Sequence, residues 1–275
     1  MKKKKTPIPE LPTNCYLIDS HCHLDMESYQ EDLAETLHRA KSHGIKSIIT
    51  IGIDEQSSLA AVELARQYPM IKATVGVHPH DAEKIDDGTY SRIRKLVAAN
   101  TKHIVAYGEI GLDYAKEYSP KQIQLKRFEE QLILAKELKL PVIIHDRDAH
   151  DDCLALLQAN APFPDGGVMH CFSGDTNLAR KVLELGFYIS IPGVVTFKNG
   201  KDLQEVVVDI PLTSLLLETD GPFLAPVPWR GKRNEPAYLA YTAQKVSELK
   251  GISIAKVAEQ TSNNVQNLFR YTPDK

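Results

Sequence analysis

The sequence predicts a single-domain α/β protein with the TIM-type (β/α)₈ barrel fold. Short β-branched runs alternate with amphipathic segments of helical period, and eight such units follow one another from Tyr16 onward. The length of 275 residues is close to the roughly 250 residues of a typical barrel of this kind. The strand candidates are also too apolar for a sheet with one solvent-exposed face, which favours strands that are covered on both sides.

The predicted elements are spread evenly along the chain. The strands are expected to end near His21, Ile51, Val77, Glu109, His145, Cys171, Ile191 and Asp220. Helical spacings of three and four separate the apolar residues between them, as in Leu125, Phe128, Leu132, Ala135 and Leu138. A further helix is expected over residues 252–269. Residues 15–275 would then form the barrel with this extra C-terminal helix, and residues 1–14 a Pro-rich N-terminal extension with little to hold it.

Composition and charge narrow the class of protein. Hydrophobic residues make up 43% of the chain, yet no run approaches the roughly 18 apolar residues of a membrane-spanning helix. A net charge of −3 argues against coating nucleic acid by bulk electrostatics. The four cysteines are too few and scattered for a disulfide framework. We therefore expect a cytoplasmic protein without membrane association. A monomer is favoured, although the sequence leaves the oligomeric state open.

His21 and His23 stand at the end of the first predicted strand. Because strand side chains alternate, a spacing of two puts both imidazoles on one face, which in a barrel is the interior mouth. Two unrelated polar residues would explain this motif equally well if it stood alone. Four more metal-competent residues lie at later strand ends, namely Glu109, His145, His170 and Asp220. Their separations assign the six residues to strands one, four, five, six and eight, whose carboxyl ends converge.

These six residues, which we call the candidate ligands, exceed what one tetrahedral ion with an open position needs. Two divalent ions that share a bridging carboxylate are the economical solution, and Glu109 is the expected bridge. One ion would be held by His21, His23 and Asp220 with Glu109, and the other by His145 with His170. Mixed imidazole and carboxylate ligands suit Zn²⁺, Mn²⁺, Fe²⁺, Co²⁺ or Ni²⁺, while Mg²⁺ normally prefers oxygen.

The residues beside the candidate ligands allow more than one interpretation. His78 closes the third strand and either faces the mouth or is bonded locally in its loop. Asp19 either orients a metal ligand by hydrogen bonding or is simply a buried acid whose hydrogen bonds are made inside the barrel. Alternation turns Cys22 and Cys171 away from their neighbouring histidines, so both are expected to be buried structural thiols.

Several motifs together resemble the TatD family of metal-dependent hydrolases. They are Leu17–Leu24, Gly76–His80, Gly108–Tyr114, His170–Gly174, Glu218–Asp220, Arg230–Pro236 and Asn264. The resemblance covers nearly the whole chain after Asn14, and it departs from the family pattern at Gly221, where Ala is usual. It implies an amidohydrolase-like barrel, metal binding by the six candidate ligands, and deoxyribonuclease activity.

For phosphodiester hydrolysis, two ions would lower the pKa of a bound water and give hydroxide near neutral pH. Asp220 is placed to accept a proton, and Glu109 to position both ions. His78 or Arg147 would contact a non-bridging oxygen, although Arg147 also has nearby acids with which it could pair. We expect a deoxyribonuclease, specifically an exonuclease. A metal-dependent deacylase or amidase is the alternative, and a metal-binding scaffold without activity is disfavoured by the complete ligand set.

The loop after the eighth strand gathers an aromatic residue and three cations, Trp229, Arg230, Lys232 and Arg233. Cations that contact phosphate and an aromatic face that stacks on a base are the combination used to bind single-stranded nucleic acid. The alternative is a solvated basic loop with Trp229 packed beneath it. Beside a phosphodiesterase site, the pattern predicts that DNA binds here through single-stranded ends.

Overall fold

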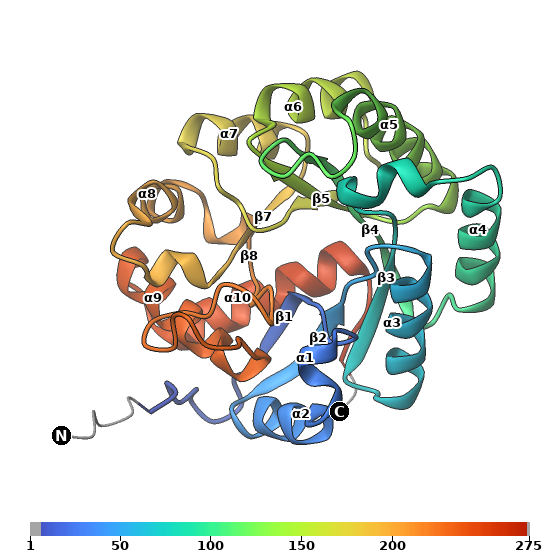
Figure 1. The fold of residues 1–275 in the computed structure, drawn as a ribbon. Helices are drawn as coiled ribbons and strands as arrows, with labels where there is room; N and C mark the ends of the chain where they lie inside the picture. The colour runs from blue at the N-terminus through green and yellow to red at the C-terminus, as the bar shows by residue number, and fades with distance from the viewer. Residues whose placement is uncertain (1–6, 274–275) are drawn as a thin grey trace.

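The computed structural model describes residues 7–273 and shows a TIM-type barrel, which confirms the predicted fold (Figure 1). Eight parallel strands follow one another around the sheet in chain order. They are β1 (Leu17–Cys22), β2 (Ile45–Thr50), β3 (Ile71–Val75), β4 (Ile104–Asp113), β5 (Val142–Arg147), β6 (Gly167–Met169), β7 (Tyr188–Ile191) and β8 (Leu215–Leu217). A bridge between Cys22 and Gly221 brings the last strand back to the first and nearly closes the barrel.

Helices cover the outside of the strands (Figure 1). They are α1 (Glu27–Gln30), α2 (Leu33–Ser42), α3 (Glu55–Gln67), α4 (Thr89–Ala99), α5 (Lys121–Leu138), α6 (His150–Ala159), α7 (Thr176–Glu184), α8 (Lys201–Asp209), α9 (Leu239–Lys250) and α10 (Ile254–Phe269). Short 3₁₀ turns add η1 (Pro79–Lys84), η2 (Gly193–Thr196), η3 (Leu212–Ser214) and η4 (Pro236–Tyr238). In α5 the predicted apolar face is the packed one, since Phe128, Leu132 and Ala135 are buried.

Some strand ends differ from those expected because local bonding at the mouth overrides the simple pattern. β4 runs past Glu109 as far as Asp113, because Gly111–Asp113 pair with His145–Arg147 of β5. β8 stops at Leu217, short of Asp220. The backbone of Asp220 turns into the left-handed region at φ 54°, and its N–H donates to the carbonyl of His21. The side chain of Asp220 therefore reaches the mouth from a loop.

The barrel interior is filled by side chains from several strands. One buried cluster joins Ile18, Ile49, Ile51, Val105, Ile143, Val168 and Leu216. Residues from strands around the whole sheet can meet only inside it. Helix α10 adds three residues to the same cluster, Val265, Leu268 and Phe269. Figure 1 shows α10 lying across the barrel and not in the outer ring of helices.

Polar contacts place α10 at the amino ends of the strands. The side-chain amide of Asn264 donates to the carbonyls of Leu212 and Leu215, at 2.8 Å each. The hydroxyl of Ser262 donates to the carbonyl of Tyr16 at 3.0 Å. These three contacts lie at the first residue of a strand or within three residues before it. The predicted extra helix therefore closes the amino end of the barrel and leaves the carboxyl end open.

The N-terminal lead-in is better anchored than expected within the described residues. Ile8 and Leu11 both pack against the main core cluster. A methyl group added at Gly44 would meet the side chain of Leu11 at 2.7 Å, so this glycine gives the lead-in room to approach. The predicted extension over residues 1–14 begins outside the described residues, and its boundary stays a prediction. Within residues 7–273, no helix is long and apolar enough to cross a membrane.

Candidate metal centre

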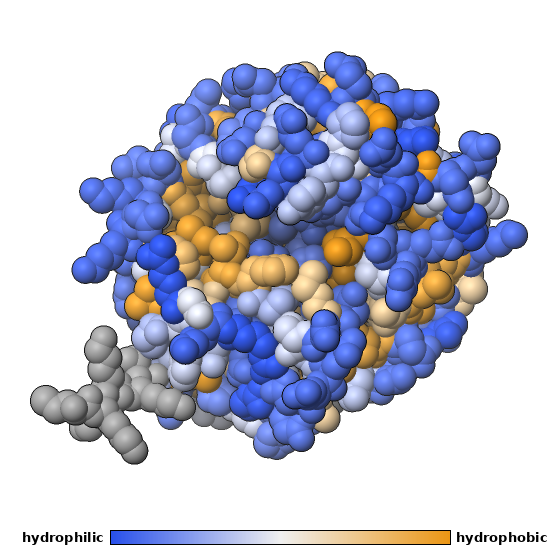
Figure 2. Space-filling model, viewed as in Figure 1, coloured by the Kyte–Doolittle hydropathy of each residue, from blue (hydrophilic) through white to orange (hydrophobic). Residues whose placement is uncertain are grey.

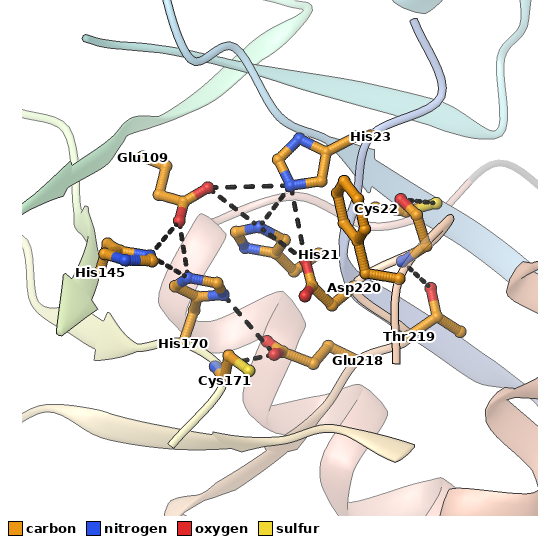
Figure 3. Close-up of polar contacts among 12 residues, drawn as sticks. His21, Cys22, His23, Glu109, His145, His170, Cys171, Glu218, Thr219 and Asp220 are labelled. Atoms are coloured by element: carbon orange, nitrogen blue, oxygen red, sulfur yellow. Dashed lines mark hydrogen bonds and ion pairs between the residues drawn. The ribbon is translucent and has the colours of Figure 1, made fainter. Parts of the chain in front are cut away.

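All six candidate ligands converge at the carboxyl end of the barrel, as strand-end placement predicts (Figure 3). Most of them line one cavity of about 590 Å³. His21 is not among the lining residues and is almost fully buried. The cluster is thus a deep polar site in a barrel whose lower interior is apolar.

Glu109 stands between two groups of histidines and offers one carboxylate oxygen to each (Figure 3). Its Oε2 lies 3.3 Å from Nε2 of His21 and 3.8 Å from Nε2 of His23. Its Oε1 lies 2.7 Å from Nδ1 of His145 and 2.7 Å from Nε2 of His170. This is the arrangement expected of a bridging carboxylate.

Asp220 completes the group around Oε2. Its Oδ1 lies 3.5 Å from Nε2 of His23 and 3.8 Å from Nε2 of His21. The two imidazole nitrogens are themselves 3.3 Å apart. On the other side of Glu109, Nδ1 of His145 and Nε2 of His170 converge at 3.2 Å.

The spacing of the imidazole nitrogens fits divalent cations, whereas the 2.7 Å contacts of Glu109 Oε1 with His145 and His170 are hydrogen-bond distances. A tetrahedral ion with bonds of about 2.1 Å keeps its ligand atoms roughly 3.4 Å apart. The nitrogen pairs at 3.3 and 3.2 Å match that spacing, and each pair lies beside one oxygen of Glu109. The buried histidines and acids form groups whose ligand atoms are close enough to hold metal, namely His21 with His23 and Asp220, His78 with Glu109 and His145, and His21 with His170 and Glu218.

Charge in the cluster is balanced between carboxylates and imidazoles. Burial would raise the pKa of Glu109, but the neighbouring His170 holds it well below its usual range. Burial opposes protonation of His170, yet the charge of Glu109 keeps its pKa well above the usual value. Divalent cations would replace such protons, because metal binding requires deprotonated ligands.

Asp113 fixes the orientation of His145. Its Oδ2 lies 3.2 Å from Nε2 of His145 and 2.8 Å from Nε2 of His80. Burial would raise the pKa of Asp113, but hydrogen bonds with His145 and His80 outweigh burial and lower it well below its usual range. An ionised Asp113 accepts a hydrogen from Nε2 of His145, which leaves Nδ1 free to bind a cation.

Glu218 and Asp19 support the cluster from the β8 side. Oε1 of Glu218 lies 3.6 Å from Nδ1 of His170 and accepts the backbone N–H of Cys171 at 2.7 Å. Asp19 accepts both the backbone N–H and the hydroxyl of Thr219, at 2.9 and 2.5 Å. Thr219 precedes Asp220, so Asp19 holds the turn that presents this candidate ligand.

His78 faces the cluster as well. Its Nε2 lies 3.5 Å from Oε1 of Glu109, while its Nδ1 accepts the backbone N–H of His80 at 3.1 Å. Burial and the neighbouring His145 lower the pKa of His78 to about 4. A neutral ring whose Nδ1 is an acceptor carries its hydrogen on Nε2, and His78 therefore presents a donor to the cavity.

The two cysteines differ from each other. Cys22 is fully buried beside Tyr29 and belongs to the core cluster, as expected. Cys171 lines the cavity and is only partly buried, so the expectation of a buried structural thiol was wrong for this residue. β6 ends at Met169, and the backbone of Cys171 has a left-handed φ of 44°. The alternation on which the expectation was based does not reach this residue.

The residues predicted to bind substrate fall in two places. Arg147 lines the cavity and is its only Arg or Lys among residues 7–273. The other four, Trp229, Arg230, Lys232 and Arg233, lie on the loop after β8 and outside the cavity lining.

Packing and ion pairing already engage part of this basic loop. Arg233 makes a two-pronged ion pair with Asp32, at 2.6 and 2.8 Å. The Trp229 ring stacks on Tyr238, with centroids 5.0 Å apart. The guanidinium of Arg230 lies 4.5 Å above the ring of Phe197.

Asp113 and Glu218 were given no role from the sequence, although both lie in recognised motifs. The signal that could have found Asp113 is even spacing along a strand direction. Asp113 follows Glu109 by an even number of residues, and Glu218 precedes Asp220 by two. Side chains at such spacings share a face of a strand, which makes Asp113 of β4 a candidate for the same site. Glu218 lies beyond the end of β8, so its only signal is that it is close to Asp220 in sequence.

Comparison with known proteins gives this site a class and a family. A family model described as TatD related DNase matches residues 18–270. The uncharacterized metal-dependent hydrolase YabD of Bacillus subtilis is 44% identical over 254 residues, covering 92% of this chain and 99% of YabD. Its counterpart YcfH of Escherichia coli K12 is 38% identical over 260 residues, covering 92% and 96%.

A solved structure agrees in fold. The TatD homolog YjjV of Escherichia coli K12 superposes with a TM-score of 0.89 at 32% identity, covering 94% of this chain and 99% of YjjV. The barrel and its buried histidine and carboxylate cluster define a metal-dependent hydrolase. The chain belongs to the TatD family, which confirms the resemblance seen in the sequence.

Proposed function

We propose that this protein is a two-ion deoxyribonuclease that removes residues from single-stranded DNA ends as an exonuclease. The observation that carries the proposal is Glu109, whose two oxygens face separate pairs of histidines at 2.7 to 3.8 Å. Paired ions bridged in this way suit phosphoryl transfer, where both the attacking and the leaving oxygen need stabilisation. The family description, TatD related DNase, supports DNA as the substrate.

The cations would be divided between the two sides of Glu109. When bound, they would lower the pKa of a water molecule and stabilise charge on the phosphoryl oxygens. One would be held by His21, His23 and Asp220 with Oε2, and the other by His145 and His170 with Oε1. This donor set suits Zn²⁺, Mn²⁺, Fe²⁺, Co²⁺ or Ni²⁺, and Mg²⁺ less well.

Asp220 is the proposed proton acceptor. Burial would raise its pKa, but the hydrogen bond with His23 lowers it, so the carboxylate is ionised at neutral pH. The side chain reaches the cavity from the turn held by Asp19 and Thr219. An ionised carboxylate at the cavity wall can orient a nucleophilic water and take its proton.

His78 and Arg147 would bind the phosphate. The Nε2–H of His78 points toward the cluster and can donate to a non-bridging oxygen. Arg147 brings a positive charge to the same cavity. Together they would hold the phosphate against the candidate ligands and orient it for in-line attack.

A hydrolysis panel on one metal-loaded preparation tests the proposal. It compares single-stranded DNA, duplex DNA, RNA, and ester and amide substrates, each with and without chelation. We expect the fastest turnover on single-stranded DNA and its loss on chelation. Turnover of acylated substrates alone would overturn the proposal in favour of a deacylase or amidase. DNA binding without turnover of any substrate would favour a scaffold.

The basic loop supplies a second test. If Arg230 and Lys232 hold the phosphate backbone, changing both to Ala should raise the KM for DNA. It should also reduce the slope of log affinity against log salt concentration by about two, since each phosphate contact contributes about one to that slope. Arg233 is already paired with Asp32, so adding Arg233→Ala should change little further. Trp229→Ala should weaken single-stranded DNA more than duplex only if its ring also stacks on a base. A small chromogenic phosphodiester is the control, because it is too short to reach the loop.

A further inference from the structure

The mouth of the cavity is bordered by apolar side chains that the proposed chemistry does not use. Phe223 and Leu224 lie on the loop after β8 and are 48% and 36% exposed. Figure 2 shows apolar surface gathered beside a hollow on a face that is otherwise mostly hydrophilic. Phe223 and Leu224 also line the cavity itself. Apolar groups gathered at the rim of a cavity mark a ligand-binding surface.

The backbone of Phe223 is held firmly although its ring is exposed. Its N–H donates to the carbonyl of Asp220 at 2.8 Å. The amide of the fully buried Asn234 donates to the carbonyls of Phe223 and Thr219, at 2.7 Å each. Asn234 thus ties together both ends of the turn that carries Asp220 and Phe223. A backbone fixed in this way keeps the ring beside the cavity before a ligand binds.

The ring lies directly beside the candidate metal centre. Its centroid is 6.0 Å from that of His23, and the two rings meet edge to face. Groups attached to a phosphate at the candidate ligands would therefore lie within reach of Phe223. Trp229, the aromatic residue that the sequence suggested for this purpose, stacks on Tyr238 and is not part of the cavity lining.

The cavity fits one nucleotide better than a length of backbone. Its volume of about 590 Å³ lies within the roughly 300 to 1,000 Å³ of small-molecule sites. Arg147 is the one Arg or Lys among the described lining residues, so the cavity has few positive side chains with which to bind several phosphates. A planar base next to a single phosphate matches an aromatic ring next to a metal centre.

We propose that Phe223 is a specificity-determining residue whose ring stacks on the unpaired terminal base next to the phosphodiester bond being cleaved. The inference rests on the proposed deoxyribonuclease function and adds to it the group that recognises the substrate end. The terminal residue is held by its base as well as by its phosphate. An unpaired terminal base is required, because a paired base cannot offer its face to the ring.

The test compares two single-stranded oligodeoxynucleotides that differ only at their ends. One carries normal terminal residues, and the other carries abasic residues at both ends. The wild-type protein should remove the normal residue with a kcat/KM roughly 5- to 150-fold higher, since stacking on one base contributes about 1 to 3 kcal/mol. Phe223→Ala should lose this advantage and cleave the abasic oligonucleotide as wild type does. Phe223→Trp should keep it.

Val227→Ala is the matched control, because Val227 is similarly exposed on the same loop but lies outside the cavity lining. It should leave both rates unchanged, and metal content should be equal in all variants. Phe223→Leu separates stacking from simple apolar contact. If Phe223→Leu keeps the full preference for the normal oligonucleotide over the abasic one, base stacking is overturned. Residue 223 would then act through apolar contact alone, as a site for an acyl or alkyl group does. Equal loss on both oligonucleotides in Phe223→Ala would also overturn the inference. Failure of the wild type to cleave either oligonucleotide would overturn the proposed function itself.

Discussion

The two ends of the barrel are built from opposite kinds of side chain. At the carboxyl end, buried imidazoles and carboxylates crowd together around Glu109. At the amino end, Val265, Leu268 and Phe269 of α10 seal the interior with apolar contacts. One end holds the chemistry, and the other contributes hydrophobic burial that stabilises the fold.

Hydrogen bonding shows the same contrast. Among the described residues, four buried atoms of the cluster lack a hydrogen-bond partner, namely Nδ1 of His21, His23 and His170 and Oε2 of Glu218. At the amino end, Asn264 and Ser262 are both bonded to backbone carbonyls at or just before the starts of strands β8 and β1. Buried polar groups without partners lower the free energy of unfolding, so the site makes the fold less stable than an apolar interior would. Substitutions at the carboxyl end should therefore alter metal content and activity, and substitutions at the amino end should alter the free energy of unfolding.

The largest expected effect is at the centre of the cluster. Glu109→Ala should abolish hydrolysis and lower metal content more than any other single change, because both sides lose an oxygen donor. Elemental analysis and activity measurements on the purified variant test this. The free energy of unfolding of the metal-free variant should stay close to that of the metal-free wild type.

Glu137→Ala is the control for Glu109, since Glu137 is a surface acid paired with Arg94. It should keep full metal content and activity. Unchanged metal occupancy in Glu109→Ala would show that Glu109 does not bridge two ions. A large loss of metal-free stability would show that the cluster supports the fold, contrary to the contrast between the two ends.

The next effect in size is at the amino end. Phe269→Ala should lower the free energy of unfolding by about 3 to 5 kcal/mol, because it leaves a cavity under the barrel. Metal content and the rate per folded molecule should not change. Chemical denaturation followed by circular dichroism measures the first quantity, and activity well below the melting temperature measures the second.

If Phe269→Ala does not fold, Phe269→Leu provides a milder change with the same direction. A lower rate per folded molecule in either variant would mean that the two ends of the barrel are coupled. That result would contradict the separation of stability from chemistry.

Asp220→Asn should have a smaller effect than loss of the bridge. The amide can still ligate weakly but cannot accept a proton, so we expect a rate lower by about 10² with the fold intact. At least one ion should remain bound. Pre-steady-state turnover with parallel metal analysis tests this, and near-normal turnover would remove Asp220 from the mechanism.

Much of this contrast could be predicted from the sequence. The β-branched runs and helical periods predicted the barrel because a parallel sheet buried on both faces needs such residues. The spacing of His21, Glu109 and Asp220 predicted their convergence because parallel strand ends meet at one edge. The helix over residues 252–269 was also predicted, and α10 occupies 254–269. The periodicity of that helix did not reveal that it closes the amino end.

The details that failed depend on backbone turns. Cys171 and Asp220 both have positive φ values, of 44° and 54°, and strand alternation does not extend to them. The ion pair between Arg233 and Asp32 joins residues far apart in sequence, so no local sequence pattern could predict it. Asp113 was missed for a different reason, because β4 continues farther than the apolar pattern suggested.

The smallest expected effect concerns Asp113, which contacts a candidate ligand but not the centre of the cluster. Asp113→Asn keeps an oxygen acceptor near Nε2 of His145 and removes the negative charge. The metal affinity on the His145 side should fall by about 10- to 100-fold, as is typical when such a partner is lost. The His21 side should keep its affinity, which a competition titration with a chelator can resolve as two steps. His80→Ala removes the other partner of Asp113 and should weaken binding less, because the charge remains. Equal weakening of both steps in Asp113→Asn would mean that Asp113 shapes the whole mouth instead of orienting one imidazole.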